Sequence, residues 1–458
     1  MRFKNRRSSS KGKRFILSTL LILLVGAGAG GFILFFEGEK PLASLDGTGD
    51  FLGNNATIQY SVHDNKSGIR SIYLWAEQDG NKKILHSKEY PRSTYKSPVG
   101  PLEEIEEIGF DIKKQGFKEG PLTITLEATD FSLQGWFKGN KVTVIKEVSV
   151  DTKPPKIQIL HTEKYISPGG SGIAIYKVSD KESIHGVTVN SKFNQGFLLG
   201  DGRDDTFIAF FALPYDTAKI EELNITARDK AHNETIVPFS TTLKKARQKR
   251  DIINVSDGFL SRKIPEFQQY YPEMTGDFID KYLYANSSVR KHNNKQISEL
   301  CINSSPERLW KGHFTRMAGS ARAGFADHRT YKHNGEVVDH QVHLGMDIAS
   351  TRRAEVKAAN NGKVVFGDYL GIYGNMVLLD HGQGVFSLYS HLSQINVTVG
   401  DSVKGGGVIG LTGTTGMAGG DHLHFSMLVH GTFVTPKEWW DKHWIDVTID
   451  EPITDSKF

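Results

Sequence analysis

The sequence is poor in cysteine, with Cys301 as the single thiol among 458 residues. One thiol excludes an intramolecular disulfide and a zinc site built from thiolates. The 47 glycines follow no three-residue period, which excludes a collagen-like chain. A content of 38% hydrophobic and 24% charged residues excludes a fully disordered chain and a membrane protein with many spans. At this length two to four globular domains are expected.

Positive charge is scarce outside the N-terminus. Seven of the 56 Lys and Arg residues lie within residues 1–14, which contain no acidic residue. The remaining chain therefore carries 49 basic and 52 acidic side chains. Because this part is not basic, we expect no nucleic-acid partner.

One long hydrophobic run follows the basic tail. Residues 15–36 contain no charge and are long enough to cross a bilayer as a helix. The positive charges before the run place the N-terminus in the cytoplasm and the rest of the chain outside. A cleaved signal peptide is the alternative, but the apolar run continues past the small residues Ala27 and Ala29. We favour an uncleaved anchor, in which Gly26 and Gly30 could pack two copies into a dimer.

Residues 40–245 alternate between short apolar segments and turn residues, which is typical of β-sandwiches. We expect two modules, over residues 40–150 and 151–245. They resemble bacterial immunoglobulin-like modules, and the favoured interpretation is that they are spacers. Their aspartates could bind calcium, although such residues more often cap turns. The two modules echo each other loosely, because Val62–Ser67 and Ala128–Asp130 recur as Val178–Ser183 and Ala227–Asp229.

Residues 246–309 are mostly polar, with apolar residues at roughly helical spacing. We predict a linker of two or three short helices, which could also lie over the cleft of the last domain. That domain is expected over residues 310–445, followed by a tail at 446–458.

Histidine is concentrated in this last domain, where 11 of the 17 histidines fall between His313 and His443. Histidine is the commonest metal ligand and carries protons near neutral pH. In His343-Leu-Gly-Met-Asp347 the two end side chains would lie roughly 13 Å apart in an extended chain. Gly345 permits a bend that brings them together.

The pair His422-Leu-His424 reads as the start of a strand, where residues two apart point to the same face. One imidazole can bind a metal while the other addresses its water. The glycine-rich residues 410–420 precede this pair without a Gly-Lys-Ser/Thr motif, which excludes a nucleotide phosphate loop. A further histidine, His391, ends another expected strand.

Together these motifs resemble the lysostaphin/LytM-type zinc metallopeptidases, which cleave peptide bonds in peptidoglycan. The resemblance implies a β-rich domain whose antiparallel sheet lines a narrow groove. This chain has Ala326 and Arg352–Ala354 where glycine is usual in the family, which leaves local loop shape open. The matching segments are Phe325-x-x-x-Arg329, His343–Asp347, Ala358–Val364, Tyr373–Asn375, Asp380–Gly382, Tyr389–Leu392, Val399–Val403, Gly410–Gly416 and His422–Phe425.

The resemblance implies that His343, Asp347 and His424 bind one Zn²⁺ per catalytic domain. Such a ligand set leaves a fourth position for water, whose pKa zinc lowers. His391 and His422 would flank this water as catalytic residues. The sequence has no HExxH glutamate, and a histidine is a reasonable general base in its place; which histidine acts as the base is left open.

Two further residues of the matching segments, Arg329 and Asn375, are candidate substrate-binding residues. Arg329 could bind a substrate carboxylate through two hydrogen bonds. The alternative interpretation of Asn375 is that it is a turn residue in the sequence Tyr-Gly-Asn.

We therefore predict a mainly β chain, anchored in a bacterial inner (cytoplasmic) membrane, with its catalytic domain periplasmic or extracellular. The predicted function is a zinc metalloendopeptidase that hydrolyses peptide cross-links of peptidoglycan stems, either D-Ala–diaminopimelate links or glycine bridges. The alternative is a regulatory LytM-domain protein that binds the wall or activates an amidase; retention of all five site residues favours the enzyme. Divisome or wall-synthesis proteins are candidate partners of the sandwich modules, which could also serve as a wall-binding scaffold.

Overall fold

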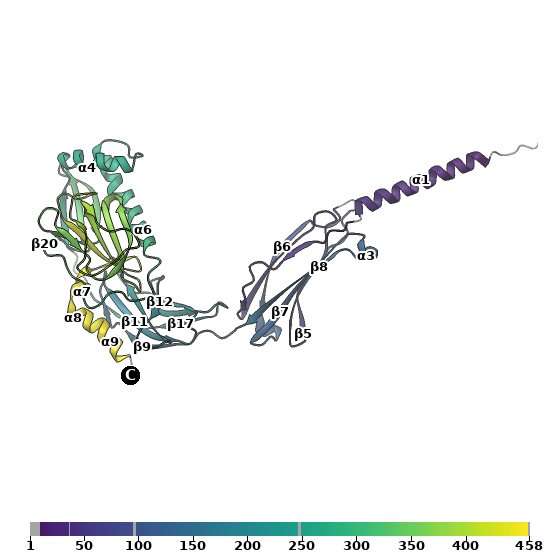
Figure 1. Ribbon diagram of the computed structural model, residues 1–458, viewed down its shortest axis with the longest axis horizontal. Coiled ribbons are helices and arrows are strands. Elements are labelled where there is room, and N and C mark those ends of the chain that lie inside the picture. Colours follow the sequence, from purple (N-terminus) through teal and green to yellow (C-terminus); the bar gives the residue numbers. More distant parts are fainter. Residues whose placement is uncertain (1–9, 36, 95–97, 246–248, 457–458) are drawn as a thin grey trace, which may run out of the picture. The chain divides into compact units, whose positions relative to one another are not determined.

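The computed structural model describes residues 10–35, 37–94, 98–245 and 249–456. The predicted mainly β class is confirmed, with 42% strand and 20% helix. The chain divides into two compact units, drawn in Figure 1. The first comprises Met1–Pro154 with Lys230–Asn233, and the second comprises Pro155–Asp229 with Glu234–Phe458.

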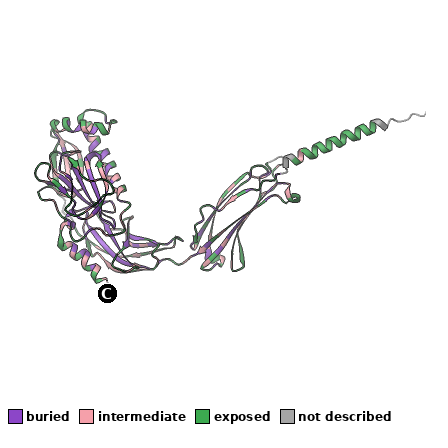
Figure 2. Cartoon of the chain, viewed as in Figure 1, coloured by how far each residue is buried: buried purple, intermediate pink, exposed green. Residues whose placement is uncertain are grey.

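The N-terminal apolar run forms the helix α1 (Ser10–Phe35). Its segment Gly12–Phe32 is long and apolar enough to cross a membrane, and a signal sequence would meet the same criterion. None of this segment is buried by protein, and Figure 2 shows it as almost entirely exposed. Residue 36, the predicted end of the span, and basic residues 2–7 lie outside the described residues.

The first unit contains a β-sandwich of two sheets with a common core. Its strands alternate as predicted: in β3 the side chains of Ala56, Ile58, Tyr60 and Val62 are buried and those between them are not. One sheet has the order β1-β3-β6 and the other β2-β8-β7-β4-β5. Its elements are β1 (Leu42–Ser44), β2 (Phe51–Leu52), β3 (Asn55–His63), β4 (Ile69–Gln78), β5 (Asn81–Glu89), β6 (Glu103–Asp111), α2 (Ile112–Gln115), β7 (Gly120–Asp130), α3 (Gln134–Phe137) and β8 (Lys141–Val150).

A second sandwich opens the second unit. Its sheets have the orders β14-β15-β11-β9 and β13-β12-β16-β17. The immunoglobulin-like topology expected for both sandwiches stays a prediction. The strands are β9 (Ile157–Thr162), β10 (Tyr165–Ile166), β11 (Ser171–Val178), β12 (Ile184–Val189), β13 (Lys192–Gln195), β14 (Phe197–Leu198), β15 (Thr206–Ala212), β16 (Leu223–Arg228), β17 (Glu234–Pro238) and β18 (Thr242–Leu243).

The strand β15 of this sandwich is buried on both faces. Phe207 and Phe211 face the sandwich's own core, whereas Ile208 and Phe210 lie in the core of the C-terminal domain. Continuous apolar strands of this kind are typical of two-sided burial. The second sandwich therefore shares a core with the C-terminal domain, and its expected role as a spacer stays a prediction.

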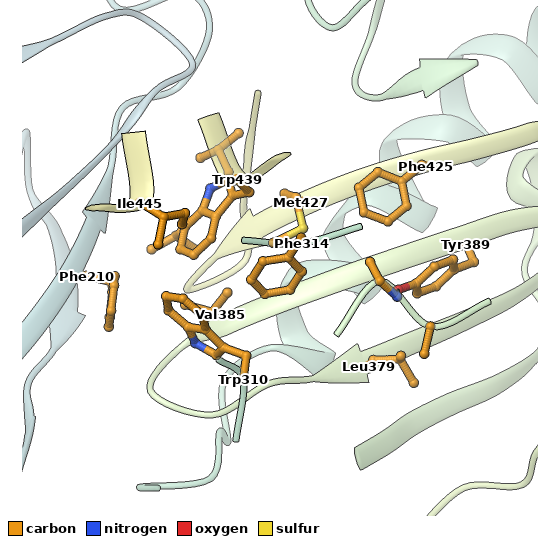
Figure 3. Close-up of a cluster of buried hydrophobic side chains, with 14 of the residues drawn as sticks. Phe210, Trp310, Phe314, Leu379, Val385, Tyr389, Phe425, Met427, Trp439 and Ile445 are labelled. Carbon is orange, nitrogen blue, oxygen red and sulfur yellow. The ribbon is translucent and has the colours of Figure 1, made fainter. Parts of the chain in front are cut away.

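Aromatic side chains fill the shared core, as Figure 3 shows. Phe210 lies 6.1 Å from both Trp310 and Trp439, measured between ring centroids. Phe314 makes an edge-to-face contact with Trp439 at 5.5 Å.

An antiparallel sheet forms the centre of the C-terminal domain, in the order β20-β23-β31-β27-β26-β25-β29, with β32 paired to β31. The strands β24, β30 and β28 form a separate small sheet, in the order β24-β30-β28. The elements are β20 (Ser320–Ala323), β21 (Asp327–His333), β22 (Glu336–His343), β23 (Met346–Ala349), β24 (Glu355–Lys357), β25 (Gly362–Tyr369), η2 (Gly371–Tyr373), β26 (Asn375–Asp380), β27 (Val385–Leu392), β28 (Gln394–Ile395), β29 (Ser402–Val403), β30 (Val408–Leu411), β31 (Leu423–Val429) and β32 (Thr432–Val434).

The predicted helical linker is wrong in one respect, because it also contains a strand. β19 (Arg250–Asn254) pairs in parallel with β21 of the C-terminal domain. Its mostly exposed, polar residues lack the apolar alternation that would predict a strand. The second module was expected to end at residue 245 and the linker to begin at residue 246. Residues 246–248 lie outside the described residues, so this boundary stays a prediction. The helices are α4 (Asp257–Tyr270), α5 (Phe278–Tyr284), η1 (Ala285–Val289) and α6 (Arg290–Leu300).

Residues 446–456, expected as a tail, are also folded. They form η3 (Asp446–Asp450) and α9 (Glu451–Asp455), after α7 (Pro436–Trp440) and α8 (Lys442–Ile445). Ile449 is fully buried in the shared core, which explains why this segment is ordered.

Replacing Phe210 by Ala tests the shared core. We expect the second unit to lose about 3–5 kcal/mol of unfolding free energy, because the truncation leaves a cavity between the two parts. The control Phe193→Ala removes a ring that is 40% exposed and should lose less than about 1 kcal/mol. Calorimetric unfolding measures both, and equal small losses would contradict a shared core.

Candidate metal centre

Two neighbouring strands and the bend before them bring three predicted metal ligands together. His343 ends β22, and Asp347 in β23 lies directly opposite His424 in β31. The predicted bend between the first two residues is present at Gly345. A Cβ atom at Gly345 would come within 2.6 Å of His424 Nε2 and Ser426 Oγ, so this close approach requires glycine.

The three side chains point one atom each at a common centre. His343 Nε2 lies 2.9 Å from Asp347 Oδ1 and 2.9 Å from His424 Nδ1, and the latter two atoms are 3.0 Å apart. All three residues are buried, at 5%, 9% and 5% exposure in sequence order. The structure thus places this predicted set in one compact triangle.

Hydrogen bonds behind the triangle determine which imidazole nitrogens carry protons. His343 Nδ1 donates to the carbonyl of Gly324 at 2.8 Å. His424 Nε2 donates to Ser426 Oγ at 3.1 Å, and that hydroxyl donates to the carbonyl of Leu344 at 2.8 Å. The two nitrogens that face the centre therefore present lone pairs.

Three lone-pair atoms at such short separations repel one another unless a cation lies between them. Zinc binds imidazole nitrogen and carboxylate oxygen at about 2.0–2.2 Å, which places tetrahedral ligands roughly 3.3 Å apart. The observed separations of 2.9–3.0 Å need only a small expansion to reach that value. The residues present therefore fit a zinc ion.

Asp347 is held from behind by Arg329, whose Nη2 donates to Asp347 Oδ2 at 3.0 Å. Burial by itself would raise the pKa of Asp347, but the neighbouring imidazoles of His343, His422 and His424 hold that pKa well below its usual range. Arg329 thus orients a candidate ligand. Its predicted contact with a substrate carboxylate stays a prediction.

The two histidines expected to be catalytic flank the same centre. His391 Nδ1 donates to the carbonyl of Thr415 at 2.9 Å, and His422 Nδ1 donates to that of Gly420 at 2.7 Å. This leaves both Nε2 atoms free of protons, and that of His422 lies 3.5 Å from Asp347 Oδ1. Their ring centroids are 4.9 Å apart.

The two imidazoles differ in proton affinity. Burial, with the neighbouring His422 and His424, lowers the pKa of His391 well below its usual value. Burial also opposes the charge on His422, but the Asp347 carboxylate outweighs it and raises the pKa of His422. The site therefore contains one imidazole that gains a proton readily and one that resists it.

The segment that carries His391 is held in an unusual conformation by Asn375. His391 has a φ of 62°, in the left-handed region that few non-glycine residues adopt. Asn375 Nδ2 donates to the carbonyl of Leu392 at 3.0 Å, and its backbone N–H donates to Thr415 Oγ1 at 3.0 Å. Asn375 thus holds both the segment that contains His391 and the residue Thr415, to which His391 donates its hydrogen bond. The predicted role of Asn375 in substrate binding stays a prediction.

A cavity of about 540 Å³ opens onto the triangle. The helical segment before the C-terminal domain contributes Phe259, Arg262, Tyr282 and Arg290 to its lining. The helical segment therefore lies against the cleft, which is the arrangement that the sequence analysis considered possible. Apolar spacing predicts that a helix has a buried face but not which surface that face covers.

α4 also holds the loop that orients His391. Lys263 Nζ donates to the carbonyl of Thr414, and Glu266 Oε1 accepts from the N–H of Gly416 at 2.8 Å. Thr415, whose carbonyl binds His391, lies between these two contacts. The orientation of His391 is therefore coupled to a helix outside the predicted domain.

Two other neighbours of the triangle have no role assigned to them in the sequence analysis. Tyr373 is buried, 5.7 Å from the His424 ring in an edge-to-face contact, and donates to Asn294 Oδ1 of α6. Ser426 could have been found from its position two residues after His424, on the same strand face.

The two departures from the family pattern fall where the backbone requires a left-handed conformation. Ala326 has a φ of 60° and Arg353 a φ of 55°. The loops thus keep a glycine-type conformation with other residues, which costs about 1–2 kcal/mol at each position.

Ala326→Gly is expected to raise the unfolding free energy of the second unit by about 0.5–1 kcal/mol, because relief of the left-handed strain exceeds the added freedom of the unfolded chain. The control Ala323→Gly, in the strand β20, should lower it by a similar amount. Denaturant titration distinguishes the two; destabilisation by both would contradict the strain at Ala326.

Glu266→Ala is expected to speed hydrogen exchange at the Gly416 N–H about tenfold, since the amide loses a charged acceptor. Glu273→Ala, which removes an exposed carboxylate bonded to Tyr284, should leave this exchange unchanged. Native-state exchange read by NMR or mass spectrometry measures both, and unaltered protection in Glu266→Ala would show that α4 does not hold the loop.

Comparisons with known proteins agree with this geometry. Residues 341–436 match the profile of Peptidase family M23. The chain is 40% identical over 96 residues to the DD-carboxypeptidase/endopeptidase Mpg of Neisseria meningitidis, which is 21% of this chain and 22% of that protein. It is 38% identical over 95 residues to the murein hydrolase activator EnvC of Escherichia coli (21% and 23%) and 41% identical over 93 residues to lysostaphin of Staphylococcus staphylolyticus (19% and 19%).

The chain spans about a fifth of the length of these curated relatives. The match covers all five histidine and aspartate residues around the centre, from His343 to His424. The resemblance to lysostaphin/LytM-type peptidases is therefore confirmed for this part, and the chain carries a C-terminal domain of peptidase family M23.

Proposed function

We propose that the C-terminal domain is a zinc-dependent endopeptidase that hydrolyses peptide cross-links of peptidoglycan. The observation that carries the proposal is the triangle of lone pairs on His343, Asp347 and His424, flanked by His391 and His422. A bound zinc ion would supply a Lewis acid and a water of lowered pKa at this centre.

The chain's own residues supply positioning and proton transfer. His343 and His424 are oriented as ligands by Gly324 and Ser426, and Arg329 turns Asp347 Oδ1 toward the centre.

His391 and His422 each present a bare Nε2 beside the centre, where an imidazole can accept a proton from a nucleophile and return it to a leaving amine. Because the Asp347 carboxylate stabilises a proton on His422, this residue is the better candidate to accept one at Nε2.

Charge around the cavity favours a peptide that carries carboxylates. Arg262, Arg290 and Arg322 line the cavity together with Arg329, against the acidic residues Asp251 and Asp347. Stem peptides linked through D-Ala and diaminopimelate carry free carboxylates, whereas a glycine bridge has none. We therefore favour D-Ala–diaminopimelate cross-links as the substrate. In this proposal Arg329 keeps its predicted role as a contact of a substrate carboxylate.

The N-terminal helix suggests where this activity takes place. We propose that α1 remains as an anchor in a bacterial cytoplasmic membrane, with the basic tail in the cytoplasm and the M23 domain outside it. The length and hydropathy of α1 support this placement, and the positive charges before it set the direction.

A regulatory role is the second candidate, because one relative is named a murein hydrolase activator. The five side chains at the centre favour the hydrolase, since a regulator does not need ligands held in a geometry suited to zinc.

The test uses the purified full chain in detergent, with zinc content measured, incubated with sacculi. We expect cross-linked muropeptide dimers to disappear. We expect His424→Ala to lower zinc content and to slow cleavage by at least about 100-fold, since even outer-shell changes weaken metal sites about 10- to 100-fold.

His340→Ala is the matched control, because His340 is an exposed histidine of the same domain outside the cavity. It should cleave like the unmodified chain. Zinc bound without cleavage, together with stimulation of an added amidase, would contradict the peptidase and favour the regulator.

A further inference from the structure

A second group of carboxylates lies in the first unit, in the membrane-proximal sandwich. Glu37 comes shortly after α1, Asp64 follows β3, and Asp130 ends β7. Their exposures are only 5%, 1% and 0%. One oxygen from each lies within 4.8 Å of the others.

The hydrogen bonds that Asp130 and Asp64 accept all come from N–H donors. Asp130 Oδ1 accepts from the backbone N–H groups of Ser132 and Asn140 at 2.9 and 2.7 Å, and its Oδ2 accepts from Asn140 Nδ2 at 2.9 Å. Asp64 Oδ2 accepts two further backbone N–H groups, the closer at 2.6 Å. Oxygens that face only donors suit a carboxylate rather than a protonated acid.

These negative charges have no positive partner in the described part of the first unit. No salt bridge joins any of the three to a Lys, Arg or His within residues 37–94 and 98–154. Burial raises the pKa of Glu37 and of Asp130, and the charge of Asp64 raises both further. Buried carboxylates in such proximity are unfavourable unless a cation neutralises them.

Two buried oxygens at the same place lack a hydrogen-bond partner among the described residues. They are Asp64 Oδ1 and Ser67 Oγ, in residues that are each only 1% exposed. The backbone N–H of Ser67 donates to Glu37 Oε2 at 3.0 Å, so its hydroxyl lies beside that carboxylate. Buried polar atoms are almost always satisfied, so these two oxygens indicate a missing ligand.

We propose that Glu37, Asp64 and Asp130 bind one Ca²⁺, with the Ser67 hydroxyl as a further ligand. The donor set is all oxygen, without nitrogen or sulfur, which suits a hard cation. The three oxygens lie within 4.8 Å of one another, which is close enough for one ion, because calcium–oxygen distances of about 2.3–2.6 Å allow two ligands to lie up to roughly 5 Å apart. Magnesium demands a near-ideal octahedral geometry and usually keeps several waters, so an enclosed set of protein oxygens suits calcium better.

The ion would fasten the chain between α1 and the first sandwich. Glu37 already accepts hydrogen bonds at its backbone carbonyl from Ser132 Oγ at 2.8 Å and Asn140 Nδ2 at 2.9 Å. Calcium would add its carboxylate to this attachment. The site thus concerns the membrane-proximal part of the chain and is separate from the proposed peptidase activity.

The repeat between the sandwiches provides a matched control. Asp180 corresponds to Asp64 in the second sandwich, but it belongs to no metal-type group among the described residues. Asp64→Asn and Asp180→Asn therefore make the same chemical change at equivalent positions, one inside the proposed site and one outside it.

The test is calcium titration of the calcium-depleted full chain in detergent, by calorimetry. We expect one Ca²⁺ per chain with a Kd of about 10⁻⁴–10⁻³ M, typical of extracellular modules. At about 5 mM CaCl₂ the unfolding midpoint of the first unit should rise by on the order of 5 °C. Asp180→Asn should keep both effects and Asp64→Asn should lose both.

Asp64→Asn should unfold at or above the midpoint of the unmodified chain when calcium is absent, because it removes one of the neighbouring like charges. This shows that lost binding does not come from lost folding. Absence of calcium binding in the unmodified chain, an equal shift with MgCl₂, or unchanged binding in Asp64→Asn would each overturn the proposal.

Discussion

Mutual repulsion between three lone pairs is the constraint on which the C-terminal domain depends. His343 Nε2, Asp347 Oδ1 and His424 Nδ1 are held within 3.0 Å of one another, which is unfavourable without a cation. The fold opposes this repulsion with hydrogen bonds behind each ligand and with the direct pairing of β23 to β31. The absence of a side chain at Gly345 lets the bend approach His424. Folding energy is thus used to prepare a metal site in advance.

The surroundings of the site make it part of a larger, continuously packed unit. The second sandwich shares a core with the M23 domain through Phe210, Trp310 and Trp439, and α4 holds the loop that orients His391. A site supported by packed elements keeps its geometry better than one supported by loops alone. The segments before the M23 domain therefore contribute to the centre rather than only carrying it.

The sequence predicts the local features of this protein well. The uncharged run indicates α1, the two-residue alternation indicates strands such as β3, and the His343–Asp347 and His422–His424 spacings identify side chains that the structure brings together. Each of these signals depends on neighbours within a few residues, where sterics and periodicity act directly.

Long-range contacts account for what sequence reasoning missed. Alternation shows that a face is buried but not what covers it, so the wall formed by α4 and the role of Asn375 beside His391 could not be derived. The strand β19 is too short and polar to be recognised before its partner β21 is known. One signal was available: the unbroken apolar run Phe207–Ala212 is typical of a strand buried on both faces.

Anomalous diffraction at the zinc edge from crystals of the full chain tests the central claim most directly. We predict one strong peak in the C-terminal domain, bonded to His343 Nε2, Asp347 Oδ1 and His424 Nδ1 at about 2.0–2.2 Å. A fully folded domain with no peak at this position, grown with zinc present, would contradict the account.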